Sequence, residues 1–241
     1  MQQFGTSRPA LRKTPLFLLS VAGACVGFAA VLWATGRYGP GISHDSVAYL
    51  FAAKSLLAGH GLEYFGYPSP YLQWPPLFPA LLAMAGLFGM DAVTAARWLN
   101  AFSLAGIILY GGLLLSRLMH HRASALVGIS LLVFSAPLIR VSKYVWTEPS
   151  FILLFLCFLD AFERYLRVQR RLFLVLASIA LSLCWMDRYI GVAVVMTGGL
   201  FLLWEGRRPL LRRCQDLLLY AAITVPPIWW LILIRPKIEG A

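Results

Sequence analysis

The chain has 241 residues, of which 60% are hydrophobic and only 13% are charged, whereas soluble domains are about 45–50% apolar. This composition, with a mean hydropathy of +0.74, excludes a water-soluble fold and indicates a membrane protein. The net charge of +11 does not indicate a nucleic-acid partner, because the basic residues lie in short gaps between apolar runs and not on a soluble basic face.

Seven apolar runs predict transmembrane helices packed as an all-α bundle, because a helix of about 20 apolar residues spans the hydrocarbon layer. In chain order the runs are 16–34, 92–116, 123–140, 149–162, 172–186, 189–204 and 217–234. We therefore expect a single membrane domain, 1–241.

Arginine and lysine are concentrated in four short segments, namely the residues before the first run and the segments 117–122, 163–171 and 205–216. Short loops rich in these residues stay on the cytoplasmic side of a membrane. The pattern predicts a multi-pass protein of the cell membrane with a cytoplasmic N-terminus.

The long segment 35–91 is expected on the outer side, since Arg37 and Lys54 are its only basic residues before Asp91. Two short helices are predicted in it, one at 47–57 along the membrane interface and one at 76–90 that is re-entrant or interfacial. The second is too short for a span, and its two prolines disfavour a regular helix.

Asp45 follows the first predicted span and precedes the helix predicted at 47–57. Two interpretations are equally open. Ser43 or Asp45 could cap the start of that helix, where free backbone N–H groups and the helix dipole favour such side chains. Alternatively, the Asp45 carboxylate lies at the mouth of a membrane cavity and accepts a proton from an acceptor hydroxyl or amine as that group attacks.

Glu148 and the pair Asp187 and Arg188 are predicted on the same outer side as Asp45, each beside the end of a span. Glu148, followed by Pro149, could simply favour the start of a helix. The pair could simply reach the membrane interface with its charged ends. Convergence of these groups would instead make a site, in which the guanidinium of Arg188 suits a phosphate.

Aromatic residues are dense in the outer loop, at Tyr64, Phe65, Tyr67, Tyr71 and Trp74. An aromatic belt at the membrane interface explains them by default. The alternative is a wall against which a sugar ring or an isoprenoid chain packs. The sequence contains no dinucleotide-binding motif and no P-loop, which fits a donor that arrives through the membrane on a lipid carrier.

Four motifs, by their order and placement, resemble the GT-C class of membrane glycosyltransferases, most closely the protein O-mannosyltransferase and aminoarabinose-transferase-like group. They are SHDSVAY at 43–49, WPPLFP at 74–79, TEP at 147–149 and DRYIG at 187–191. The resemblance implies transfer of a hexose or a pentose from a polyprenyl-phosphate donor to a lipid, protein or glycan acceptor on the outer face of the membrane.

The same resemblance implies roles for three residues. Asp45 would be the catalytic base or would position the acceptor, Glu148 would be the second acidic residue, and Arg188 would face the donor phosphate. Asp45 and Glu148 would also be the ligands of a divalent metal ion, if the reaction uses one.

Tyr49 and Trp74, which lie in these motifs, and Lys143, a weaker phosphate candidate, complete the predicted substrate-binding residues. Family members usually continue for several more spans, so we expect this chain to be the N-terminal portion of a longer protein. Two other classes stay open: a transporter or flippase fragment, which would bury ionisable residues near the middle of the membrane, and a non-catalytic membrane scaffold.

Overall fold

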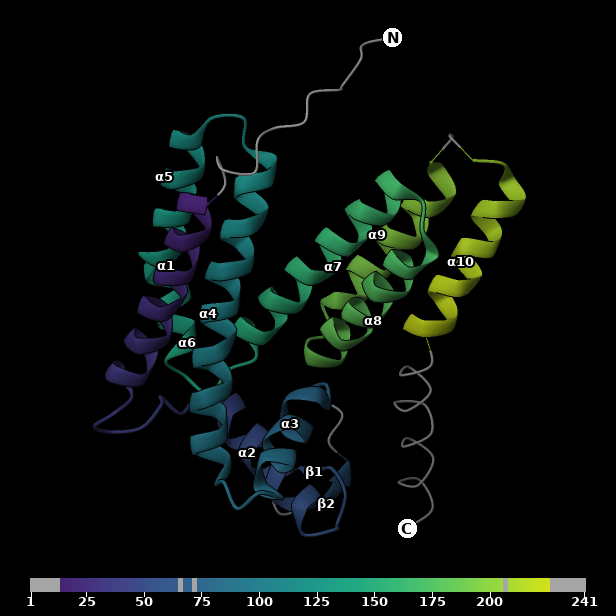
Figure 1. Cartoon of the computed structure of the whole chain (residues 1–241). Helices are drawn as coiled ribbons and strands as arrows, with labels where there is room; N and C mark the ends of the chain where they lie inside the picture. The colour runs from purple at the N-terminus through teal and green to yellow at the C-terminus, as the bar shows by residue number, and fades with distance from the viewer. Residues whose placement is uncertain (1–13, 65–66, 71–72, 206–207, 226–241) are drawn as a thin grey trace.

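A computed structural model of the chain describes residues 14–64, 67–70, 73–205 and 208–225. In these residues the chain forms helices and one two-stranded antiparallel sheet, which confirms the predicted all-α membrane fold (Figure 1). In order, the elements are α1 (Thr14–Ala34), α2 (His44–Leu57), β1 (Glu63–Tyr64), β2 (Tyr67–Pro70), α3 (Leu77–Gly86), α4 (Ala92–Leu118), α5 (Arg122–Val133), α6 (Ala136–Ser142), α7 (Glu148–Val168), α8 (Arg171–Asp187), α9 (Gly191–Trp204) and α10 (Leu210–Thr224).

The helices are arranged in two groups above a small module. Helix α1 packs along α4, with α5 and α6 beside them, and α7 packs along α8, with α9 and α10 beside α8. Helix α4 also contacts α7 and so joins the two groups. Helices α2 and α3 and the sheet lie together at the lower end in Figure 1, and we call them the outer module.

Three stretches of the described chain are long and apolar enough to cross a membrane, Pro15–Ala34, Ala92–Leu118 and Arg122–Ser142. They coincide with the first three predicted spans. The other four predicted spans overlap α7 to α10, which are shorter or carry more charge, and the last predicted span, 217–234, extends beyond the described residues. The membrane nature of the fold is thus confirmed, while the number of seven spans stays a prediction.

The third of these stretches, Arg122–Ser142, consists of two helices with a break between them, although the sequence shows a single apolar run at 123–140. Helix α5 ends at Val133 and α6 begins at Ala136. Ser135 lies in the break, and its hydroxyl accepts a hydrogen bond from the backbone N–H of Leu138 at 3.4 Å. This capping contact, with Pro137 in the first turn of α6, starts a new helix where the hydrophobic pattern alone predicts an uninterrupted one.

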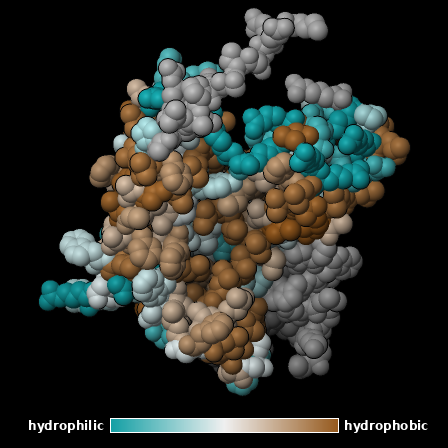
Figure 2. Space-filling view, viewed as in Figure 1, coloured by the Kyte–Doolittle hydropathy of each residue, from teal (hydrophilic) through white to brown (hydrophobic). Residues whose placement is uncertain are grey.

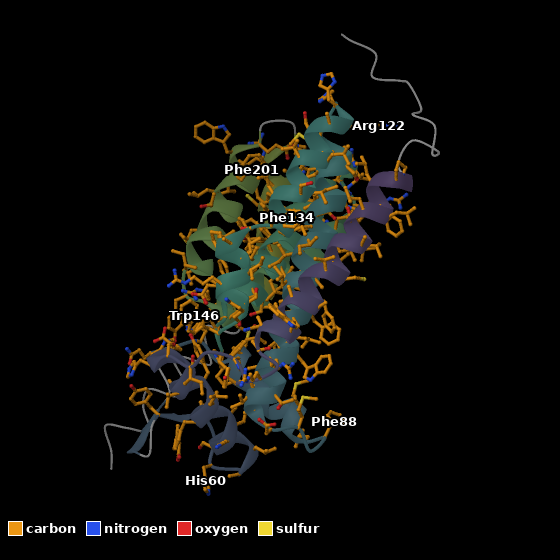
Figure 3. All side chains as sticks on the ribbon, turned by 90° about the vertical axis from the view of Figure 1, so that its left-hand side faces the viewer. His60, Phe88, Arg122, Phe134, Trp146 and Phe201 are labelled. Atoms are coloured by element: carbon orange, nitrogen blue, oxygen red, sulfur yellow. The ribbon has the colours of Figure 1, made fainter. Side chains whose placement is uncertain are left out.

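Large apolar side chains cover the middle of the molecule, as a membrane requires (Figure 2). Among them, Phe134 is 78% exposed and Phe201 is 47% exposed. Figure 3 shows both between Arg122 at one end and His60 at the other, nearer to Arg122. In Figure 2 the hydrophilic surface is concentrated at the upper end, where α7 ends and α8 begins. We call this the arginine-rich end.

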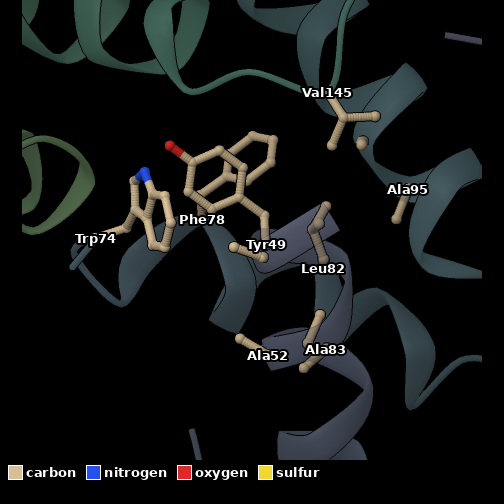
Figure 4. Close-up of a cluster of buried hydrophobic side chains, with 11 residues drawn as sticks. Tyr49, Ala52, Trp74, Phe78, Leu82, Ala83, Ala95 and Val145 are labelled. Carbon is tan, nitrogen blue, oxygen red and sulfur yellow. The ribbon is translucent and has the colours of Figure 1, made fainter. Parts of the chain in front are cut away.

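The outer module has its own hydrophobic core. Tyr49 and Ala52 of α2 pack there with Phe78 and Leu82 of α3 (Figure 4). Both predicted short helices of the segment 35–91 are therefore present, although α2 begins three residues earlier than expected and α3 ends at Gly86. Because Val145 belongs to the same core, the outer module is fixed against the segment that leads into α7.

Candidate functional site

The outer module is joined to the start of α7 by main-chain hydrogen bonds. The N–H of Gly41 donates to the carbonyl of Lys143 at 2.8 Å, and the N–H of Val145 donates to the carbonyl of Gly41 at 3.0 Å. A Cβ on Gly41 would lie 2.5 Å from Cδ1 of Tyr144, so this approach requires glycine. We call this pairing of Gly41 with residues 143–145 the main-chain clamp. It brings the Asp45 and Glu148 segments together.

Ser43, and not Asp45, caps helix α2. The hydroxyl of Ser43 accepts the backbone N–H of Ser46, and the hydroxyl of Ser46 accepts the backbone N–H of Ser43, which completes a capping box. The indole N–H of Trp146 also donates to the Ser43 hydroxyl at 2.7 Å. The Asp45 side chain therefore is not needed as the cap, and it stands exposed in the first turn of the helix.

Glu148 and Arg188 form an ion pair that joins the start of α7 to the end of α8. The Nη1 atom of Arg188 lies 2.6 Å from Oε1 of Glu148, and the same nitrogen donates to the hydroxyl of Thr147 at 3.0 Å. Both charged side chains are about one-third exposed, at 36% for Arg188 and 32% for Glu148. The predicted meeting of Glu148 with Arg188 is thus present, with the guanidinium oriented by two neighbours.

Asp187 lies beside this pair but faces inward. Its side chain is buried, and Oδ2 accepts a hydrogen bond from the hydroxyl of Ser150 at 2.6 Å. Ser150 is a contact that the sequence analysis missed. Its position three residues after Thr147, on the same face of α7, is the signal that could have revealed it.

Tyr49 connects the outer module with these charged groups. Its hydroxyl hydrogen-bonds the side chain of Thr147 and interacts electrostatically with the charges of Asp45, Arg188 and Glu148. Figure 4 shows this hydroxyl pointing away from Ala52, on the side of the core where Trp74 lies. Burial raises the pKa of Tyr49 well above its usual range, and the two carboxylates also raise it, although the Thr147 hydrogen bond and the charge of Arg188 act in the opposite direction. The side chain therefore remains a neutral hydroxyl.

Trp74 is buried beside Tyr49 instead of standing at the surface. Its ring centroid lies 6.1 Å from that of Tyr49, 6.1 Å from that of His44 and 5.6 Å from that of Tyr64, on which it stacks. These contacts position Tyr49 and the first turn of α2. Of the other aromatic candidates, Phe65 and Tyr71 lie outside the described residues, as does the side chain of Tyr67.

Lys143 contributes its backbone carbonyl to the main-chain clamp. Among the described residues no ion pair joins the Lys143 or Arg140 side chain to the acidic groups of the site. Arg188 is the cation that pairs with Glu148.

Residues suited to hold a metal ion were also predicted here, Asp45 and Glu148. Within the described part of the chain, no three His, Cys, Asp or Glu side chains lie close enough together to bind a metal ion. Glu148 is already paired with Arg188. The two carboxylates do not by themselves satisfy a hard cation, which takes six or more oxygen ligands.

The candidate site therefore combines an exposed carboxylate, a carboxylate paired with an arginine, and a neutral phenol at one end of the bundle. The carboxylate of Asp45 can accept a proton, and the fixed guanidinium of Arg188 can bind a phosphate or stabilise charge that develops on one. Such a set suits the transfer of a group away from a phosphate.

At the opposite end, the buried carboxylate of Asp160 is already satisfied. It accepts a hydrogen bond from the hydroxyl of Tyr110 at 2.5 Å and pairs with Arg117 and Arg164. A transporter would keep such a group available for a cation or a proton, so this arrangement gives the transporter alternative no support.

Comparison with known proteins identifies the family. The family model of dolichyl-phosphate-mannose-protein mannosyltransferases matches residues 53–235, which is more than half of the chain. The matched region contains Trp74, Lys143, Glu148 and Arg188, whereas Asp45 lies just before it. No curated protein matches the sequence. The match confirms the resemblance to GT-C glycosyltransferases, and the chain belongs to the dolichyl-phosphate-mannose-protein mannosyltransferase family.

Proposed function

We propose that this protein transfers mannose from a polyprenyl-phosphate carrier to a hydroxyl group of a protein acceptor, at the outer face of the membrane. Its family is one of membrane mannosyltransferases. The observation that carries the proposal is the arginine of α8 held by the first turn of α7, directly beside the helix that presents Asp45.

Arg188 is the proposed phosphate-binding residue. The contacts to Glu148 and Thr147 both use its Nη1 atom, and the side chain is 36% exposed, so other donors of the guanidinium can reach a ligand. A planar guanidinium holds phosphate oxygens in a fixed geometry. The ion pair with Glu148 fixes the arginine before the donor binds, which lowers the cost of ordering it.

Asp45 is the proposed general base. The acceptor oxygen forms a bond to the anomeric carbon of mannose while its proton passes to the Asp45 carboxylate. The bond between that carbon and the phosphate oxygen breaks, and the electron pair leaves with the polyprenyl phosphate. Arg188 stabilises the negative charge that collects on the leaving phosphate.

Glu148 has two proposed tasks. Its Oε1 atom orients Arg188, and its Oε2 atom is buried without a hydrogen-bond partner among the described residues. A buried carboxylate oxygen is costly to leave unpaired. Oε2 is therefore suited to accept a hydrogen bond from the acceptor, while the Tyr49 hydroxyl supports Thr147 from the other side.

The test is Asp45→Asn in the protein reconstituted in lipid, with transfer of labelled mannose from polyprenyl phosphate mannose to a serine- and threonine-rich peptide as the readout. We expect the rate to fall about 10²- to 10⁴-fold, the contribution of a general base. Binding of the donor should change little, because Arg188 is untouched.

Asp91→Asn is the matched control. Asp91 is also an exposed aspartate. It follows α3 of the outer module and caps the start of α4, and asparagine caps a helix equally well. The control should transfer mannose at the normal rate. A normal rate for Asp45→Asn, with normal insertion, would exclude Asp45 as the base and would favour the scaffold alternative if Glu148→Gln were equally active.

A further inference from the structure

A cavity lies far from the proposed transfer site. It has a volume of about 530 Å³ and opens between α4, α5 and α7, where Figure 1 shows α4 and α7 diverging toward the arginine-rich end. Its wall is made mainly of leucine side chains, namely Leu114, Leu115 and Leu118 of α4, Leu132 of α5, and Leu156 and Leu159 of α7.

The charged residues of this cavity all lie at one end. Along α7 the lining changes from Leu159 to Asp160, Glu163 and Arg167, and along α4 it reaches Arg117. Arg117 is 29% exposed and Arg167 is 67% exposed. The cavity thus has an apolar wall and a charged mouth. A phospholipid in the leaflet next to the arginine-rich end has its acyl chains and its headgroup arranged in the same order.

The mouth retains positive charge after its internal pairs are counted. Asp160 is shared by Arg117 and Arg164, and Glu163 faces Arg167 at 3.6 Å. Three arginines therefore face two carboxylates. The ion pair of Arg117 uses its Nη2 atom, which leaves further N–H donors of that guanidinium for a ligand.

This cavity is independent of the proposed transfer site. Glu148 begins α7 and Arg167 lies in its last turn, so the two positions are separated by roughly 28 Å along the helix axis. The polyprenyl-phosphate donor cannot have its phosphate at both ends.

We infer that the cavity binds one phospholipid with an anionic headgroup, taken from the leaflet next to the arginine-rich end. One acyl chain lies along the leucines, which would otherwise lose dispersion contacts on the open side. The headgroup phosphate lies between Arg117 and Arg167, where basic side chains at a membrane surface favour anionic lipids.

Charge complementarity selects this occupant over a protein segment. A second copy of the chain, or another helix, would cover the leucines but would also have to satisfy Arg117 and Arg167 with acidic groups. The bilayer supplies an apolar chain and an anionic group already joined at the correct depth.

The experiment compares lipid retention. The protein is purified in mild detergent from vesicles of equal parts phosphatidylglycerol and phosphatidylcholine, and the lipid that stays bound is measured by native mass spectrometry. We expect the wild-type protein to retain phosphatidylglycerol preferentially. Arg167→Gln should lower that preference roughly fivefold, since one arginine near an anionic surface contributes this much, and Leu114→Trp should abolish retention by filling the cavity.

Two matched controls separate a site from general attraction. Arg170→Gln removes an exposed arginine of the same end that does not line the cavity, and Thr197→Trp fills a different apolar cavity, between α7 and α9. Neither should change retention. Equal loss in Arg170→Gln, retention in Leu114→Trp, no preference for phosphatidylglycerol, or a dimer that protects the cavity would each overturn the inference.

Discussion

At the scale of single residues, Asp187 has the environment most sensitive to pH. It is buried at the end of α8, just past the predicted span, and Oδ2 accepts a hydrogen bond from Ser150. Burial raises the pKa of the Asp187 carboxyl to about 7, although the Ser150 hydrogen bond and the charge of Arg188 act in the opposite direction. An unfolded aspartate titrates near pH 3.9, so folding changes its proton affinity strongly.

We predict that the free energy of unfolding falls as the pH rises from about 4 to about 7. Within this window the folded protein holds a proton on Asp187 that the unfolded chain has lost, so stability is fully present below the unfolded pKa and decreases through the folded one. The slope is at most roughly 1.4 kcal/mol per pH unit for one group. Thermal unfolding in detergent across this range measures it.

Asp187→Asn is the control for this prediction. The amide oxygen can still accept the Ser150 hydrogen bond, but the side chain no longer titrates. The variant should show a weaker pH dependence than the wild type. Identical profiles for both proteins would assign the pH dependence to other groups.

The sequence placed Asp45, Glu148 and Arg188 beside span ends and offered their convergence as one of two interpretations. The fold brings Glu148 and Arg188 into contact, while the roles of the three residues stay predictions. The sequence left the cap of α2 open between Ser43 and Asp45, and it did not reveal that Thr147 meets Tyr49. The contact between Thr147 and Tyr49 depends on how segments about one hundred residues apart pack, which local motifs do not encode.

At the scale of elements, the junction between α8 and α9 is built around a glycine. A Cβ on Gly191 would lie 2.6 Å from Cα and 2.8 Å from the backbone nitrogen of Trp185. Backbone atoms cannot move aside as a flexible side chain can. Since Trp185 is buried and its indole N–H donates to the carbonyl of Thr224 at 3.0 Å, the junction also holds α10 in place.

We predict that Gly191→Ala destabilises the protein by about 1–3 kcal/mol, the usual cost of overpacking. Mannose transfer should fall as well, because the displaced junction carries Asp187 and Arg188. Thermal unfolding and the transfer assay together measure both effects.

Gly199→Ala, in the same helix α9, is the matched control. Its Cβ would meet Leu217 Cδ1 at 3.4 Å and Tyr220 Cε1 at 3.8 Å, which are ordinary contacts. Alanine is also favoured over glycine within a helix by roughly 0.5–1 kcal/mol. The control should be neutral or slightly more stable, and equal damage in both variants would show that helix α9 simply tolerates no added methyl group.

Helix positions were predicted well and helix ends less so. Apolar runs located α1, α4, α8 and α9 within a few residues. The run at 149–162 underestimated α7, which continues to Val168 because Phe162 and Tyr165 remain packed in the hydrophobic core with α8. Hydrophobicity marks where a helix is apolar, whereas capping and packing decide where it ends.

At the scale of the whole molecule, the membrane topology depends on whether α7 crosses the bilayer. Helix α7 has 21 residues, enough to span roughly 30 Å, but its last turns are charged and it is not one of the three stretches that meet the length and composition of a span. If α7 crosses the membrane, His60 and Arg170 lie on opposite sides. If it does not, they lie on the same side.

We predict opposite sides, with His60 outside. Single cysteines at these two exposed positions, in a background without Cys25, Cys157, Cys184 and Cys214, can be labelled in intact cells with a membrane-impermeant maleimide. His60→Cys should react at once and Arg170→Cys only after permeabilisation, as the arginine-rich loops require. Labelling of both in intact cells would show that α7 does not cross.

The main-chain clamp between Gly41 and residues 143–145 also sets an order of events during synthesis. Asp45 leaves the ribosome about one hundred residues before its clamp partners, and translation proceeds at about 5–20 residues per second. For roughly 5–20 seconds the nascent outer module has the proposed base but neither residues 143–145, with which Gly41 pairs, nor Arg188. The centre can therefore be completed only after α7 and α8 have been made, so an unfinished chain would carry no active glycosyl-transfer site.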